Sequence, residues 1–152
     1  MKRGQQKCIP TPGTQQRMHL FGPYRWEDDT LVWRAAQRRN SQAFIEFLEH
    51  LLVECYPTGH FILVLDKASQ HKSTASMATL SLFEHRVQVI WLPAYCSELN
   101  PIERFWRYLK EQVCINKLHP DMAKLDQAVT DQLERQNDCQ RSDRFSLLKF
   151  IQ

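Results

Sequence analysis

The chain has 152 residues, of which 43% are hydrophobic and 11% aromatic, and a formal net charge of +3. This length and composition favour one folded domain and argue against two full domains or a mostly disordered chain. The longest strongly apolar run, Phe61 to Leu65, is far shorter than the roughly 20 residues that span a bilayer. No signal-peptide pattern follows Lys2 and Arg3. We therefore expect a soluble, cytoplasmic protein, whose mild positive charge permits a polyanionic partner.

The five cysteines are scattered and form neither a Cys-x-x-Cys pair nor a set of Cys and His at zinc spacing. An odd number of isolated cysteines is typical of thiols rather than of a disulfide framework. We expect reduced thiols, in agreement with a cytoplasmic location.

The hydrophobic pattern divides the chain into short elements. Residues 1–16 hold two prolines, two glycines and four glutamines without an apolar period, which predicts a loop or an incoming arm. The following residues, 17–33, surround an acidic stretch at 27–29, which favours a β-hairpin with an acidic turn. Ser41 is a candidate N-cap for the next helix. The other predicted elements are a strand at 61–65, a helix at 73–84, a strand at 87–92, helices beginning at Asn100 and at Pro120, and a C-terminal tail at 137–152.

The two predicted strands are almost continuously apolar, which is typical of strands buried on both faces of a sheet. A hairpin before them and helices between and after them predict an α/β domain in which helices cover a mixed sheet. A hairpin at the start of such a sheet normally has a third strand beside it, and no upstream residues are left to supply one.

Two carboxylates stand at functionally suggestive positions. Asp66 follows the strand at 61–65, and Glu103 lies in the first turn of the helix after the next strand. Open α/β sheets bind ligands at the carboxyl ends of their strands, so Asp66 and Glu103 could meet there and hold a divalent metal ion. Ordinary structural roles are also open to both. Asp66 suits a turn, and Glu103 suits a capping box with Asn100 or an ion pair with Arg107.

Basic residues flank both carboxylates, and such cations can hold a DNA backbone. The candidates for DNA contacts are Lys67, His71, Lys72, Arg104, Arg107 and Lys110. Each of them alone is explained as well by a solvated face. Tyr95 is a weak candidate for stacking on a base, whereas Trp91 and Trp106 lie on apolar sides and are expected in the core.

Two blocks of the sequence resemble a known family. The first block is Leu-Val-Leu-Asp-Lys-Ala-Ser at 63–69, followed by His71, and the second is Trp-Leu-Pro-Ala-Tyr-Cys-Ser-Glu-Leu-Asn-Pro-Ile-Glu-Arg-Phe-Trp-Arg-Tyr-Leu-Lys at 91–110. Both resemble the DDE transposases of bacterial insertion sequences, in the mariner-like superfamily. The second block is highly specific, and the segments 11–14 and 20–22 also resemble this family, so that the resemblance covers nearly the whole chain.

The resemblance implies a ribonuclease H-like fold and a site in which an Asp, a second Asp and a Glu or Asp bind two magnesium or manganese ions. Asp66 matches the second acid and Glu103 the third, with 36 residues between them, close to the interval in the family. The resemblance also implies an activity, in which the metal ions activate water and then a DNA 3′-hydroxyl for attack on phosphodiesters. The implied partners are the ends of an insertion sequence and its target DNA.

Two departures from the family pattern affect this expectation. The residue after the second acid is usually Asn in the family, whereas here it is Lys67, whose charge could weaken metal binding. The first catalytic Asp and the helix-turn-helix region of the family lie upstream of the segment that resembles residues 1–14. We therefore expect a truncated ribonuclease H-like catalytic domain at 17–136, lacking its first strand and inactive on its own, from the C-terminal portion of a transposase.

Two alternatives stay open. The chain could be a catalytically inactive remnant that at most binds DNA, a complementary N-terminal transposase chain or a second copy in a homodimer. It could also be an unrelated ribonuclease H-like nuclease whose third acid comes from elsewhere, such as Asp28, although Asp28 and Asp29 are placed in the hairpin turn. The terminal repeat, the target sequence and the oligomeric state cannot be inferred from these residues.

Overall fold

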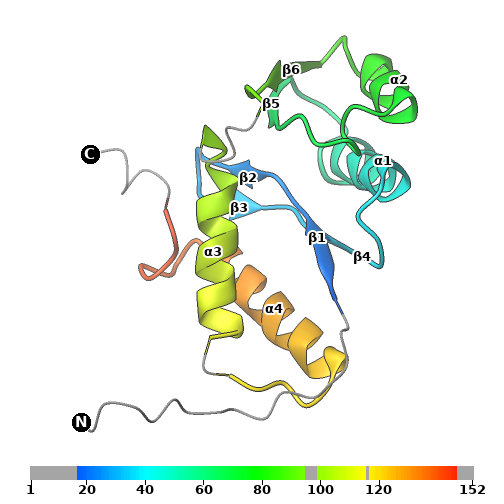
Figure 1. Cartoon of the computed structure of the whole chain (residues 1–152). Helices are drawn as coiled ribbons and strands as arrows, with labels where there is room; N and C mark the ends of the chain where they lie inside the picture. Colours follow the sequence, from blue (N-terminus) through cyan, green and yellow to red (C-terminus); the bar gives the residue numbers. More distant parts are fainter. Residues whose placement is uncertain (1–16, 95–98, 116, 147–152) are drawn as a thin grey trace, which may run out of the picture.

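A computed structural model describes residues 17–94, 99–115 and 117–146. Its elements follow the predicted order of hairpin, helix, strand, helix, strand and two helices (Figure 1). The hairpin strands are β1 (His19–Phe21), β2 (Tyr24–Arg25), β3 (Thr30–Leu31) and β4 (Arg34–Ala36). The later elements are α1 (Ser41–Glu49), the π-helix η1 (His50–Cys55), β5 (Phe61–Leu65), α2 (Thr74–Leu82), β6 (Val87–Trp91), α3 (Ile102–Val113) and α4 (Met122–Asn137).

The first four strands form one long antiparallel hairpin, in which β1 pairs with β4 and β2 pairs with β3. The acidic turn predicted from the sequence is confirmed. Asp28 accepts hydrogen bonds from Arg25 and from Thr30 Oγ1, the latter at 2.7 Å. Asp29 adopts a left-handed φ of 58° and accepts a hydrogen bond from Tyr24 Oη at 2.5 Å. Both turn carboxylates thus hold the hairpin closed.

The strands β5 and β6 form a separate parallel pair. The described strands therefore make three two-stranded sheets, two antiparallel and one parallel, rather than one continuous sheet. One face of the β5–β6 pair packs against α1, η1 and α2. On the other face, Ile62 and Val64 are 66% and 42% exposed. The expectation that these strands are buried on both faces is therefore wrong for the described residues, because none of the described elements covers that second face.

Two hydrophobic clusters hold the elements together, and the hairpin contributes to both. Phe21 belongs to the cluster that includes α1, η1, α2 and the β5–β6 pair. Leu31 belongs to the second cluster, which α3 and α4 complete around the fully buried Phe105 and Leu133. Phe145, beyond the end of α4, is also buried in the second cluster, so part of the segment predicted as a tail packs against the domain.

The helix starts depend on local polar caps. Asn40, and not the predicted Ser41, caps α1, because Asn40 Oδ1 accepts a hydrogen bond from Ala43 N at 2.9 Å. Ser73 caps α2 and Asp121 caps α4 through their side chains, at the starts of the helices predicted from residue 73 and from Pro120. Within the described ranges, none of the helices is long and apolar enough to cross a membrane.

Candidate nucleic-acid and metal site

Asp66 directly follows β5, and its carboxylate is anchored on one oxygen. Oδ1 accepts a hydrogen bond from Ala68 N at 3.1 Å and lies 2.7 Å from His71 Nδ1. The bond from Ala68 is the turn role that the residue type allows, and the side chain is still 34% exposed. Among the described residues, none forms a hydrogen bond or ion pair with the second oxygen, Oδ2. Asp66 is therefore held in place while one oxygen stays available.

His71 is fixed against Asp66 rather than extended into solvent. Its side chain is only 14% exposed, and its ring packs against Phe44 with the ring centroids 4.5 Å apart. Nδ1 also lies 3.3 Å from the backbone oxygen of Asp66. The sequence predicted His71 as a cation near the site, but it did not predict the contact of His71 with Asp66. The only signal for that contact in the sequence is the five-residue spacing of the two residues.

Glu103 lies in the first turn of α3 and is exposed. The predicted capping box is not formed, because α3 begins after Pro101 without a side-chain cap. The predicted ion pair with Arg107 is also not formed, and no other described residue bonds to the Glu103 carboxylate. Both structural explanations for a Glu at this position therefore fail, which leaves both of its oxygens available to a ligand.

The chain topology relates the two carboxylates. Leu65 pairs with Trp91, so Asp66 leaves β5 at the same edge at which the chain leaves β6. Leu92 N donates a hydrogen bond to Leu65 O at 2.8 Å across this edge. Ten residues, 92–101, then lead to α3, whose first turn lies toward the ends of the two strands in Figure 1. A joint metal site of Asp66 and Glu103 fits this arrangement and stays a prediction.

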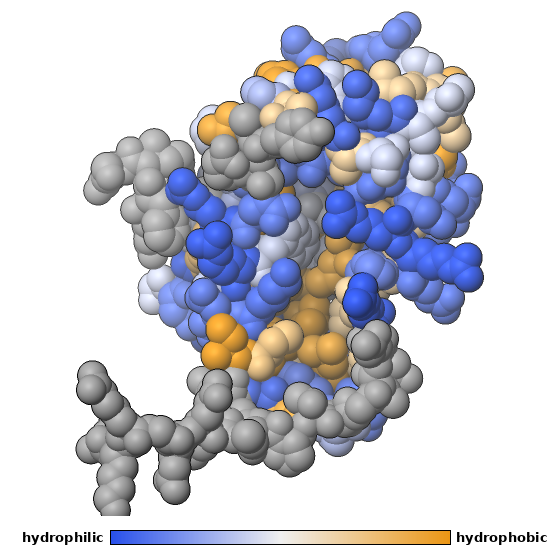
Figure 2. Space-filling view, viewed as in Figure 1, coloured by the Kyte–Doolittle hydropathy of each residue, from blue (hydrophilic) through white to orange (hydrophobic). Residues whose placement is uncertain are grey.

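Most of the predicted DNA-contacting cations are exposed. Arg104, Arg107 and Lys110 lie on the solvent side of α3, and Figure 2 shows hydrophilic surface over this helix. Lys67 is exposed beside Asp66. Lys72 is exposed too, and its Nζ lies 5.9 Å from the ring centroid of Trp91. Their contacts with DNA stay predictions, and Tyr95 lies outside the described residues.

The two tryptophans expected in the core are partly buried against it, Trp91 at the first cluster and Trp106 at the second. Gly22 shows how closely Trp106 approaches the hairpin. A Cβ added at Gly22 would lie 2.7 Å from Val32 O and 3.5 Å from the Trp106 ring. The absence of a side chain at this position thus allows the close approach of Val32 O within the hairpin, while the distance to Trp106 is that of an ordinary van der Waals contact.

Asp28, the alternative third acid, forms its contacts within the hairpin turn. Its ion pair and hydrogen bonds with Arg25, together with the bond from Thr30, lower the pKa of Asp28 to about 2. These contacts explain the residue without a metal ion, and they give no support to the alternative in which Asp28 completes a nuclease site.

Comparisons with known proteins bear on the family and the fold of the chain. Residues 1–126 match the family described as DDE superfamily endonuclease. An uncharacterised 39 kDa protein of insertion element IS630 from Shigella sonnei is 27% identical over 114 residues, which cover 75% of this chain and 33% of that protein. In structure, the chain is similar to the Mos1 transposase in its paired-end complex with the left transposon end, with a TM-score of 0.52 and 16% identity.

The structural match covers 97% of this chain and 50% of the Mos1 transposase chain. The chain therefore spans about a third of its curated relative and half of its structural one. The likeness to the Mos1 transposase shows the fold, which is the predicted ribonuclease H-like α/β fold. Because the family match extends over most of the sequence, the chain belongs to the DDE superfamily of endonucleases, as its resemblance to insertion-sequence transposases predicted.

Proposed function

We propose that this chain is part of the catalytic domain of an insertion-sequence transposase and takes part in metal-dependent DNA cleavage and strand transfer. The observation that carries the proposal is the pair of available carboxylates, Asp66 at the end of β5 and Glu103 at the start of α3. The insertion-element relative and the complex of the Mos1 transposase with a transposon end support DNA as the substrate.

The available donors fit Mg²⁺ or Mn²⁺, which prefer oxygen ligands. Asp66 would use Oδ2, while Oδ1 stays bonded to Ala68 N and His71, and Glu103 would use either oxygen. Two such ions, when bound, would activate the attacking oxygen and stabilise the leaving oxygen of a phosphodiester. His71 is a positioning residue in this scheme, because it limits the rotation of the Asp66 carboxylate.

In this proposal the exposed cations contact the DNA backbone. Arg104, Arg107 and Lys110 extend from the helix that carries Glu103, and Lys67 and Lys72 extend from the loop that carries Asp66. Contacts of this kind give affinity that falls with salt and carries no sequence information. Tyr95 completes the proposal as a residue that stacks on a base.

Metal binding tests the site directly. We expect the 152-residue chain to bind Mn²⁺, measured by electron paramagnetic resonance, and Asp66→Asn and Glu103→Gln each to weaken binding by tenfold or more. Glu111→Gln is a matched control, because Glu111 is another exposed carboxylate on α3 that lies two turns beyond Glu103. Mn²⁺ affinity that is unchanged in both site variants would rule out the proposed metal site.

The exposed ammonium of Lys67 beside Asp66 favours a second candidate, a protein that binds DNA without cleaving it. Nicking of supercoiled plasmid DNA in the presence of Mg²⁺, by the chain together with a transposase segment that supplies a first catalytic Asp, separates the two candidates. Nicking that Asp66→Asn and Glu103→Gln abolish supports the nuclease. DNA binding without nicking, together with nicking by the Lys67→Asn variant, supports the second candidate.

A further inference from the structure

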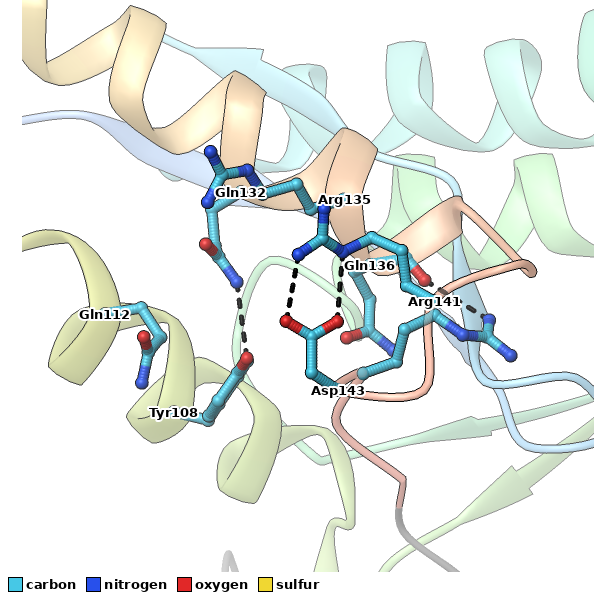
Figure 3. A pocket seen from close by; sticks show the side chains of 8 residues that line it. Tyr108, Gln112, Gln132, Arg135, Gln136, Arg141 and Asp143 are labelled. Atoms are coloured by element: carbon cyan, nitrogen blue, oxygen red, sulfur yellow. Dashed lines mark hydrogen bonds and ion pairs between the residues drawn. The ribbon is translucent and has the colours of Figure 1, made fainter.

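A small polar pocket lies between α3, α4 and the segment that follows α4, and none of its lining residues belongs to the candidate metal site. Figure 3 shows this pocket from close by. Tyr108 points into it from α3 and meets the Gln132 side chain from α4. The side chains of Arg141 and Asp143 form a further wall, from the segment after α4.

The wall of the pocket carries an excess of positive charge. Three arginines line it, Arg135, Arg141 and Arg144, against one carboxylate, that of Asp143. Asp143 is already taken by Arg141 in a two-pronged pair, with Nε to Oδ1 at 3.0 Å and Nη2 to Oδ2 at 2.9 Å. Arg135 and Arg144 therefore line the pocket without an ion pair to any described carboxylate, and the charge of Arg135 acts on Asp143 only from a distance.

Hydrogen-bond donors in the pocket also exceed acceptors. Arg144 donates through Nη1 to the backbone oxygens of Asp28 and Gln136, at 3.1 and 3.3 Å. Its Nε is shielded from solvent and has no hydrogen-bond partner. Arg135 forms neither a hydrogen bond nor an ion pair with any described residue. A guanidinium has five N–H donors and no acceptor, so these two side chains leave donors that no described residue pairs, and one of them is the buried Nε of Arg144.

A neutral hydrogen-bond donor lies on α3. Tyr108 Oη accepts a hydrogen bond from Gln132 Nε2 at 3.3 Å, which leaves the phenolic hydrogen free to donate. Gln112, one turn further along α3, adds an exposed amide to the same wall. Donors thus reach the pocket from three separate elements: α3, α4 and the segment after α4.

We propose that this pocket binds a phosphate group, with Arg135 and Arg144 as its cationic contacts and Tyr108 as a neutral donor. A phosphate suits the three walls better than a carboxylate, because its tetrahedral oxygens can accept hydrogen bonds from several directions at once. Arginine forks are the usual partners of such groups. The phosphate can come from a DNA backbone or from free phosphate in solution. The inference goes beyond the proposed function, because it assigns a ligand to residues outside the candidate metal site.

Inorganic phosphate is the first probe, titrated into the ¹⁵N-labelled 152-residue chain at low ionic strength. We expect saturable shift changes in the residues that line the pocket, and Arg135→Gln to weaken phosphate binding by about tenfold or more, as for the loss of one charged hydrogen bond. Arg39→Gln is a control of equal charge change, because Arg39 is exposed between β4 and α1, outside the pocket. Equal phosphate affinity of Arg135→Gln and the unmodified chain would overturn the proposal.

A variant with the opposite expectation makes the test sharper. Asp143→Asn removes the one carboxylate of the pocket and releases Arg141, so phosphate should bind more tightly than to the unmodified chain. Weaker binding by Asp143→Asn would contradict the proposal. Arg144→Lys keeps the positive charge but loses the forked guanidinium, so this variant should bind phosphate more weakly than the unmodified chain. Its thermal unfolding serves as the control for folding, because Arg144 also bonds to the backbone oxygens of Asp28 and Gln136.

Duplex DNA of arbitrary sequence distinguishes the two sources of the phosphate. If the DNA backbone uses the pocket, Arg135→Gln should lower the salt dependence of DNA binding by about one phosphate contact, and Asp143→Asn should raise DNA affinity. If both variants bind DNA like the unmodified chain while their affinities for inorganic phosphate differ, the pocket is a site for free phosphate. An absence of shift changes with both probes would overturn the proposal.

Discussion

His71 and Asp66 meet at two points. Nδ1 of His71 lies 2.7 Å from Oδ1 of Asp66 and 3.3 Å from its backbone oxygen. An N–H at Nδ1 is therefore shared between the carboxylate and the backbone, which fixes both the tautomer of the imidazole and the direction of the carboxylate. Packing of the His71 ring on Phe44 holds this arrangement from behind.

We predict that loss of this hydrogen bond lowers the affinity for metal ions while the domain still folds. His71→Phe keeps an aromatic ring against Phe44 but removes the donor, and it should lower Mn²⁺ affinity by about tenfold, as removal of such supporting partners usually does. His71→Asn places an amide donor near the position of Nδ1 and should recover most of the affinity. Equal Mn²⁺ affinity of His71→Phe and the unmodified chain would show that His71 does not position Asp66.

Asp28 provides a prediction for pH. Its pKa is lowered to about 2 from an ordinary value of 3.8, first through its bond with Arg25. A lowered pKa in the folded state means that the stabilisation is complete above pH 3.8 and is lost as the pH falls toward 2. The difference in unfolding free energy between the unmodified chain and Asp28→Asn, measured with urea, should therefore shrink over this range.

Both side chains of the Arg25–Asp28 pair are more than a third exposed, so salt should reduce the difference as well. Asp126→Asn, on the exposed side of α4, serves as the control for the loss of one carboxylate outside the turn. A difference for Asp28→Asn that stays constant down to pH 2 would contradict the assigned role of Asp28 in the turn.

The sequence predicted the elements whose signals are local. The continuous apolar runs marked β5 and β6, and the helices predicted from residue 73 and from Pro120 correspond to α2 and α4. Each of these signals depends on side chains within a few residues of the element, as do caps and strand propensities in general. The placement of Asp66 at a strand end and of Glu103 in the first turn of a helix followed from the same rules.

The features that the sequence did not reveal depend on contacts between distant segments. Asn137 at the end of α4 bonds to both the backbone nitrogen and oxygen of Leu31, which lies 106 residues earlier. The pocket around Arg135 and Arg144 likewise forms only when α3, α4 and the following segment come together. The exposure of Ile62 depends on which element covers β5, and a strand's own composition cannot specify that.

Cys55 offers a test of local electrostatics. Its Sγ lies 3.4 Å from His50 Nε2, and His50 Nδ1 lies 2.7 Å from Glu54 Oε2. Burial, and then the negative charge of Glu54, raise the pKa of the Cys55 thiol. A smaller fraction of thiolate at neutral pH should make Cys55 react slowly with iodoacetamide.

We predict that Cys55, in a variant whose other four cysteines are serine, is alkylated more slowly at pH 8 than a cysteine in an unstructured peptide. Glu54→Gln should accelerate the reaction, because it removes a charge that raises the pKa. Glu111→Gln changes the net charge equally at an exposed position on α3, which belongs to the second cluster, and should leave the rate unchanged. Faster alkylation of Cys55 than of the peptide would contradict the raised pKa.

Gln136 joins the hairpin turn to the segment after α4, and we predict that its loss destabilises the domain. Its side chain is 1% exposed, and Nε2 donates to the backbone oxygens of Asp29 and Phe145, both at 2.8 Å. Oε1 accepts from Phe145 N at 3.0 Å. Gln136→Met keeps a similar volume but removes all three hydrogen bonds, which contribute a net of about 0.5–1.5 kcal/mol each and so roughly 1.5–4.5 kcal/mol in all. The free energy of unfolding, measured with urea, should fall by about that amount. It should fall less for Gln132→Met, which removes the 3.3 Å hydrogen bond from Gln132 to Tyr108. Equal stability of the two variants would mean that the hydrogen bonds of Gln136 do not stabilise the domain.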